Sequence, residues 1–98
     1  MKPIWERRRK IDEIDEKLVE LLNQRAALAI EIGNFKRRNN QSPVSPDRER
    51  EIVRRACQTS AGPLDPEAIA RLFRAILEES RRAAAEATDL AISEGILR

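Results

Sequence analysis

The stretch IWERRRKIDEIDEKLVELLNQRAALAIEIGNFKRRN, residues 4–39, decides the fold. It contains no proline and a single glycine, and its apolar residues recur at steps of three and four: Ile11, Ile14, Leu18, Leu21, Leu22, Leu28, Ala29, Ile32 and Phe35. Such spacing is typical of an amphipathic α-helix. A helix of this length is about 54 Å long, well beyond the diameter of a compact domain of about 100 residues. The stretch therefore predicts one long helix that needs a partner along its apolar face.

Two further helices are predicted after the first. Residues 39–43 (NNQSP) end the long helix, and residues 45–47 (SPD) supply the cap residue, the proline and the acidic residue of a new helix start. This second helix stops at residues 59–63 (TSAGP), and residues 65–67 (DPE) repeat the start signal. A third apolar stripe follows, formed by Ile69, Leu72, Phe73, Ile76, Leu77, Ala83, Ala87 and Leu90. It predicts a helix that extends into the tail, residues 85–98, where Gly95 leaves its end open.

These elements predict an all-α fold of three helices, long, short and long, in a single domain covering residues 1–98. No alternating β-branched run and no repeat of 20 to 50 residues indicates a sheet or a solenoid. Helices of such unequal length cannot cover one another in a monomer, because much of the first would project with its apolar stripe in water. The simplest remedy is a homodimer with antiparallel long helices.

Composition excludes several classes of site. The 98 residues carry a net charge of +2, so charge alone does not indicate a nucleic-acid partner. The single cysteine, Cys57, cannot form a disulfide within the chain, and without histidine no ordinary zinc or haem site can be assembled. No stretch approaches the roughly 20 apolar residues that cross a membrane, and the first ten residues lack the apolar core of a signal peptide. We expect a cytoplasmic protein without a metal. Whether it is complete or one domain of a larger enzyme is left open.

Some polar residues violate the apolar pattern, and buried polar groups are often functional. Arg25 falls in the middle of the apolar arc of the first helix, Lys36 lies on the same arc near its end, and Ser80 lies within the apolar stripe of the third helix. Near the start of the chain, periodicity does not choose between Arg7 and Arg8. Together they predict a cavity lined by cations, which suits a small organic anion with more than one carboxylate.

Structural explanations also exist for each of these residues. Arg25 could pair with a carboxylate on another helix, Lys36 could extend to solvent, and Ser80 could bond a carbonyl one turn back. Only for Arg25 do we favour function over structure, because no acidic residue shares its arc. The chain has no motif for covalent or acid–base catalysis by the usual residues. A reaction that needs only conformational restraint and charge complementarity fits better.

Five segments, in this order and at these spacings, resemble the all-helical chorismate mutase family: residues 8–15 (RRKIDEID), 21–25 (LLNQR), 32–36 (IGNFK), 46–49 (PDRE), and Leu72-Phe73 followed by Ile76 and Ser80. The likeness covers about residues 5 to 84 and extends to mutase domains fused to prephenate dehydratases. It implies an intertwined helical dimer that rearranges chorismate to prephenate without a cofactor, at the branch leading to phenylalanine and tyrosine.

The resemblance implies roles for three cations. Arg25 is similar to the arginine that holds one substrate carboxylate within the same protomer. Arg8 is similar to the arginine that the partner chain delivers to the other carboxylate, which selects it over Arg7. Lys36 is similar to the lysine that contacts the ether oxygen and a carboxylate, where negative charge develops as the C–O bond breaks.

The resemblance also implies roles on the other two helices. Glu49 matches the glutamate that binds the substrate hydroxyl, Arg48 matches the arginine that supports the site, and Ser80 matches a polar residue close to a carboxylate. Two substrate-binding positions depart from the family. Ser45 stands where several relatives have aspartate and keeps only the helix cap. Ala84 stands where relatives have the Gln or Glu that helps to bind the ether oxygen, so catalysis is weaker or another residue replaces that contact.

Three rival functions remain. Isochorismate–pyruvate lyases have the same fold and a similar cationic pocket, but the pair Arg48-Glu49 favours the mutase. A non-catalytic helical dimerisation or metabolite-binding module is the second rival, and Ala84 strengthens it. A nucleic-acid binder has only residues 7–10 (RRRK) and 36–38 (KRR) to support it, and charge runs of that length usually form solvated helix faces.

Overall fold

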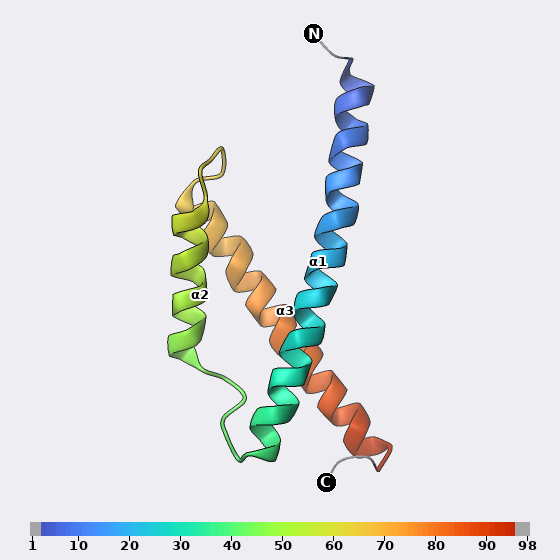
Figure 1. Ribbon diagram of the computed structural model, residues 1–98, viewed down its shortest axis with the longest axis vertical. Coiled ribbons are helices and arrows are strands. Elements are labelled where there is room, and N and C mark those ends of the chain that lie inside the picture. The colour runs from blue at the N-terminus through green and yellow to red at the C-terminus, as the bar shows by residue number, and fades with distance from the viewer. Residues whose placement is uncertain (1–2, 96–98) are drawn as a thin grey trace.

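The computed structural model describes residues 3–95 and contains three helices in the predicted order (Figure 1). They are α1 (Ile4–Arg38), α2 (Pro46–Thr59) and α3 (Pro66–Ser93). Within the described residues there is no strand. The all-α fold with a long, a short and a long helix is therefore confirmed.

The predicted start signals of α2 and α3 act as helix caps. The hydroxyl of Ser45 accepts a hydrogen bond from the backbone N–H of Arg48 at 3.4 Å, and the carboxylate of Asp65 accepts one from Ala68 at 2.8 Å. Each cap satisfies an N–H group that has no partner within its helix. Proline occupies the first turn of both helices, where its missing N–H costs nothing. The local sequence thus fixes where both helices begin.

The third helix extends into the tail, as the apolar pattern predicts. It continues to Ser93, and the chain then turns through Gly95, whose positive φ of 75° favours glycine. Residues 96–98, the last part of the predicted tail, lie outside the described residues, as do residues 1 and 2.

Helix α3 is the central element, because it contacts both α1 and α2 (Figure 1). Small residues mark the crossing of α1 and α3: a Cβ atom added to Gly33 would lie 3.6 Å from the Cβ atom of Ala84. Such small side chains let two helix backbones approach closely. The crossing sets the position of every side chain that the C-terminal half of α1 directs toward α3.

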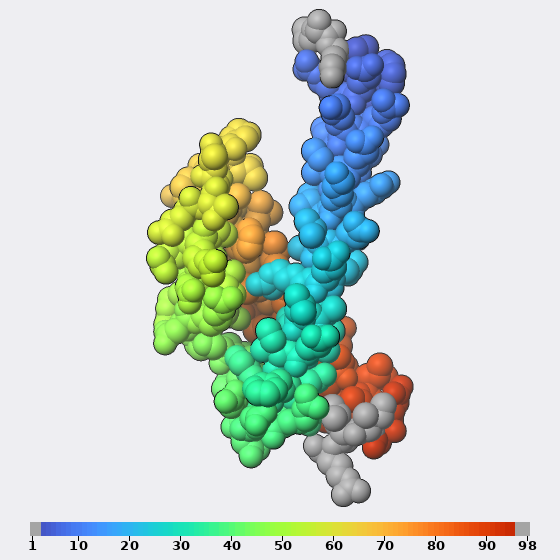
Figure 2. All heavy atoms as spheres, in the orientation of Figure 1, coloured from blue at the N-terminus to red at the C-terminus, as the bar shows by residue number. Residues whose placement is uncertain are grey.

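One chain by itself has almost no enclosed core. Among the described residues only Ala70, Leu77 and Ser80 are buried. The radius of gyration is 17.2 Å, against about 13 Å for a compact domain of about 100 residues. Figure 2 shows the N-terminal half of α1 projecting beyond the other helices. Its large apolar side chains are at least 44% exposed: Ile11, Ile14, Leu18, Val19, Leu21 and Leu22.

An exposed apolar face of this size is what the predicted homodimer would cover. The dimer itself stays a prediction, as does the single-domain organisation of residues 1–98. None of the described helices is long and apolar enough to cross a membrane.

Candidate functional site

Arg25 and Ser80 meet where α1 approaches α3. A guanidinium nitrogen of Arg25, Nη1, donates a hydrogen bond of 2.9 Å to the hydroxyl oxygen of Ser80. Arg25 is half-buried and Ser80 is only 8% exposed. Within residues 3–95 no carboxylate forms an ion pair with Arg25. The serine therefore orients the cation without neutralising it. The remaining N–H groups of the Arg25 guanidinium are available to an anion.

Lys36 lies in the last turn of α1, three turns beyond Arg25, and is half-buried. None of the ion pairs among the described side chains includes it. Its backbone carbonyl accepts a hydrogen bond from Gln41 at 2.7 Å, which fixes the end of the helix. A lysine in this position also interacts favourably with the negative end of the helix dipole. Arg25 and Lys36 thus form a cationic edge on α1.

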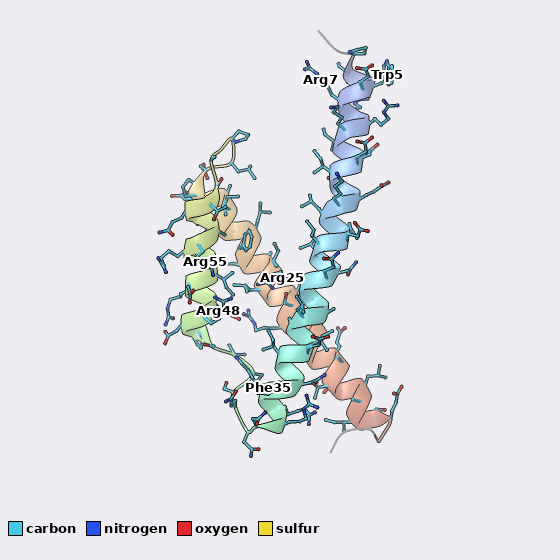
Figure 3. All side chains as sticks on the ribbon, viewed as in Figure 1. Trp5, Arg7, Arg25, Phe35, Arg48 and Arg55 are labelled. Atoms are coloured by element: carbon cyan, nitrogen blue, oxygen red, sulfur yellow. The ribbon has the colours of Figure 1, made fainter. Side chains whose placement is uncertain are left out.

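The start of α2 carries Ser45, Arg48 and Glu49, and it lies toward the end of the bundle at which α1 ends (Figure 1). Ser45 is half-buried, but its hydroxyl is engaged as the helix cap. Arg48 is exposed and pairs with Glu51 one turn later at 3.3 Å. Figure 3 shows Arg48 on α2 and Arg25 on α1, the two helices that pack against α3. The interactions of Ser45 and Arg48 among the described residues are thus local to the beginning of α2.

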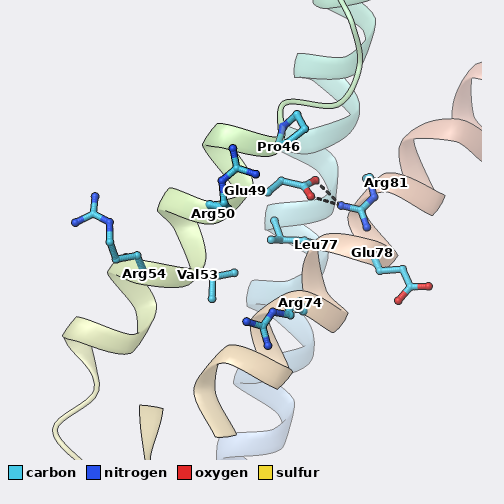
Figure 4. Close-up of a pocket in the computed structure, with 9 residues that line it drawn as sticks. All are labelled: Pro46, Glu49, Arg50, Val53, Arg54, Arg74, Leu77, Glu78 and Arg81. Carbon is cyan, nitrogen blue, oxygen red and sulfur yellow. Dashed lines mark hydrogen bonds and ion pairs between the residues drawn. The ribbon is translucent and has the colours of Figure 1, made fainter. Parts of the chain in front are cut away.

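Glu49 has a partner that the sequence analysis missed. Its carboxylate forms an ion pair with Arg81 of α3, and both carboxylate oxygens contact one guanidinium nitrogen, Nη1 (Figure 4). Arg81 directly follows Ser80, and successive helical residues point about 100° apart. The two neighbours therefore serve different helices: Ser80 holds Arg25 of α1, and Arg81 holds Glu49 of α2. No pattern in the sequence could have revealed this pair, because it depends on how α2 packs against α3.

An open groove of about 560 Å³ lies between α2 and α3 (Figure 4). Of the predicted site residues it includes only Glu49. Arginines outnumber carboxylates along it, and its lining consists of Pro46, Glu49, Arg50, Val53, Arg54, Arg74, Leu77, Glu78 and Arg81. The groove is therefore cationic and touches the predicted site at one corner, the ion pair of Glu49 and Arg81.

Arg8 does not reach this region within one chain. It is exposed on the projecting half of α1, and 17 residues separate it from Arg25, which is about 25 Å along a helix. Figure 3 shows the neighbouring Arg7 near the far end of α1. Ala84 does lie in the region, half-buried at the crossing beside Gly33, but it offers no polar group. Within one chain the observed contacts join Arg25 to Ser80 and Glu49 to Arg81, and the complete site, which includes Arg8, stays a prediction.

Comparison with known proteins decides the family. The family model described as chorismate mutase type II matches residues 7–85, most of the chain. The chain belongs to this family. The match ends at residue 85, within α3.

Curated relatives of this family member are bifunctional chorismate mutase/prephenate dehydratases. The protein from Pseudomonas aeruginosa is 40% identical over 75 residues, which cover 71% of this chain and 20% of the relative. The protein from Escherichia coli K12 is 39% identical over 79 residues, covering 80% of this chain and again 20% of the relative. The chain thus spans about a fifth of the length of these relatives.

Solved structures of chorismate mutases match over most of both chains. Chorismate mutase from Helicobacter pylori, solved in complex with prephenate, has a TM-score of 0.80 at 27% identity, covering 88% of this chain and 93% of that one. A chorismate mutase structure from Thermus thermophilus has a TM-score of 0.78 at 28% identity, covering 81% of this chain and 99% of that one. The three-helix fold of this chain is therefore the fold of these chorismate mutases.

Proposed function

We propose that this chain is a chorismate mutase, which isomerises chorismate to prephenate in the biosynthesis of phenylalanine and tyrosine. The observation that carries the proposal is the half-buried Arg25, which Ser80 orients and no carboxylate of the described chain neutralises. A cation in this state suits a substrate carboxylate, because the planar guanidinium matches a carboxylate with two hydrogen bonds. Membership of the family supplies the identity of the substrate.

The reaction demands little chemistry of the protein. In one rearrangement the ether C–O bond of chorismate breaks and a new C–C bond forms, so no proton, electron or group is exchanged with the enzyme. The barrier falls if the side chain of the substrate is held over its ring and if the charge that develops on the ether oxygen is stabilised. Fixed cations perform both tasks, and in this proposal no cofactor takes part.

Each residue then has a specific task. Arg25 binds one carboxylate, and Lys36 stabilises the ether oxygen as the C–O bond breaks. Glu49 accepts a hydrogen bond from the ring hydroxyl, Ser80 orients Arg25, and Arg48 supports the site. Since Ala84 lacks the amide or carboxyl group that relatives have at this position, we expect slower turnover than in relatives that keep it.

The second substrate carboxylate requires Arg8 of the partner subunit. An antiparallel pairing of two α1 helices brings that residue toward Arg25 if the twofold axis passes near the midpoint between them, around Glu16 and Lys17. This midpoint also lies near the middle of the exposed stretch, residues 7–24. The same pairing that covers the apolar face would therefore complete both sites of a homodimer.

Two assays test the proposed function. Purified protein is added to chorismate, the loss of chorismate absorbance is followed, and the product is identified by mass spectrometry and NMR. We expect prephenate as the only product. Release of pyruvate from isochorismate, without turnover of chorismate, would favour the lyase instead. Binding of a dicarboxylate without any turnover would leave only the metabolite-binding module.

A further inference from the structure

The ion pair between Glu49 and Arg81 differs from every other ion pair of the described chain. The other four join residues three or four positions apart on one helix, whereas this pair joins α2 to α3 across 32 residues of sequence. Its carboxylate is also the least exposed side chain in any of these pairs, at 27%. A pair that is partly buried and fixed to two packed helices is screened less by salt than a surface pair.

The geometry of the pair leaves part of the Glu49 carboxylate free. A single nitrogen of Arg81, Nη1, contacts both oxygens. A carboxylate offers about four acceptor positions, so positions remain for a further donor. Arg81 therefore fixes the direction in which the carboxylate points without saturating it.

We propose that Arg81 is a positioning residue that holds Glu49 ready to accept the hydrogen bond of the substrate hydroxyl. This inference rests on the function proposed above, because the hydroxyl belongs to chorismate. Preorganisation of this kind stabilises a bound ligand by removing the cost of ordering the acceptor during binding. Helix α3 thus contributes to the site through two adjacent residues, Ser80 and Arg81, each of which orients a charged side chain of another helix.

The test compares two inhibitors in three variants. One inhibitor is a bicyclic dicarboxylate that mimics the transition state and carries the hydroxyl, and the other is the same compound without it. Arg81→Met removes the charge but keeps an apolar stem of similar length. Arg82→Met is the matched control, because Arg82 pairs only with Glu79 on its own helix and is 60% exposed. Arg81→Lys restores one charged nitrogen, which is all that the observed contact uses.

We expect Arg81→Met to weaken binding of the hydroxylated compound, measured by calorimetry, about tenfold and binding of the compound without the hydroxyl less than about twofold. Arg81→Lys should recover most of the loss, and Arg82→Met should change neither constant. Circular dichroism and the Tm check that each variant folds. If Arg81→Met does not fold, Arg81→Gln supplies the same ratio.

Two results would overturn the inference. Equal weakening of both inhibitors would mean that Arg81 acts on the carboxylates or on the structure generally, and no weakening of either would mean that Glu49 needs no support. Wild-type protein that binds both inhibitors but does not convert chorismate would contradict the proposed function alone, because the ratio of the two constants still reports on Arg81.

Discussion

The two halves of α1 have the same apolar periodicity but opposite surroundings. Every residue from 7 to 24 is exposed, whereas half-buried residues recur from Arg25 onward, at Ala26, Ala29, Ile30, Gly33, Asn34, Lys36 and Arg37. The change coincides with the approach of α3, which contacts α1 only in its C-terminal half (Figure 1). Tertiary contact, and not helix propensity, therefore separates the two halves.

This difference assigns a task to each half. The C-terminal half holds Arg25 against Ser80 of α3 and carries the half-buried Lys36, so in our proposal it provides the site residues of one chain. The N-terminal half exposes an apolar face together with Arg8, so in our proposal it provides the dimer interface and the residue donated to the second site. Substitutions in the N-terminal half should therefore impair assembly of the dimer, and substitutions in the C-terminal half should impair binding of the substrate.

The largest effect is expected from a charge placed in the exposed half. Leu18→Asp puts a carboxylate at the centre of the proposed interface, twice per dimer, and an unpaired buried charge costs several kcal/mol. We expect the dissociation constant of the dimer to rise at least about 100-fold, and activity to disappear as the dimer is lost. Sedimentation equilibrium and turnover of chorismate measure the two effects.

Leu90→Asp is the matched control for Leu18→Asp. Leu90 is 59% exposed, compared with 50% for Leu18, and it lies beyond the residues that the family model matches. We expect it to leave assembly and turnover nearly unchanged. If Leu18→Asp also remained a fully active dimer, the exposed half of α1 would not be the interface.

The next largest effect concerns the packed half. Arg25→Ala removes a cation that binds a substrate carboxylate, and loss of one partner of such a pair costs about 2–5 kcal/mol. We expect kcat/KM to fall at least about 30-fold while the protein remains a folded dimer. The exposed Arg55→Ala is the control. Unfolding of Arg25→Ala would instead indicate that this arginine serves stability.

A smaller effect is expected from the residue that orients Arg25. Ser80→Ala removes the acceptor of the 2.9 Å hydrogen bond but leaves the cation in place. We expect kcat/KM to fall about tenfold, mainly through KM, because a misdirected Arg25 still carries its charge. Steady-state kinetics decides this. A loss as large as that of Arg25→Ala would mean that Ser80 itself contacts the substrate.

The smallest effect is expected at Ala84. Ala84→Gln restores the amide that relatives have at this position, which is half-buried and lies beside Gly33. We expect kcat to stay unchanged or to rise by up to about tenfold, since one hydrogen bond to the ether oxygen would be added in the transition state. A large fall in kcat would show that α3 is placed differently from α3 in the relatives.

The sequence predicts the helices well because their signals are local. The caps at Ser45 and Asp65 and the apolar spacing of α1 and α3 depend only on residues within a few positions of each other. The burial of Ser80 follows from the same spacing, since it lies within an apolar stripe. Periodicity therefore identifies the helices and much of the buried face of α3, whereas the apolar stripe of α1 is largely exposed in one chain, at Leu28, Ile32 and Phe35 among others.

The candidate site was less predictable because it depends on how the helices pack. Arg25 is conspicuous as a charge within an apolar arc, but its hydrogen bond to Ser80 requires the register of α1 on α3. Arg81 has no such signal: it is an ordinary charged residue on a helix until α2 places Glu49 opposite it. The role of Arg8 was suggested only by resemblance to the family, and it depends on a second chain.

Complementation between inactive variants tests most directly the claim that each site takes Arg25 from one chain and Arg8 from the other. Arg8→Ala and Arg25→Ala are each inactive as homodimers in this account. After equimolar mixing and subunit exchange, half of the dimers are mixed, and one of their two sites carries both arginines, so about a quarter of the wild-type activity should return. If mass spectrometry demonstrates subunit exchange and activity stays at the level of the separate variants, the proposal that two chains share each site is wrong.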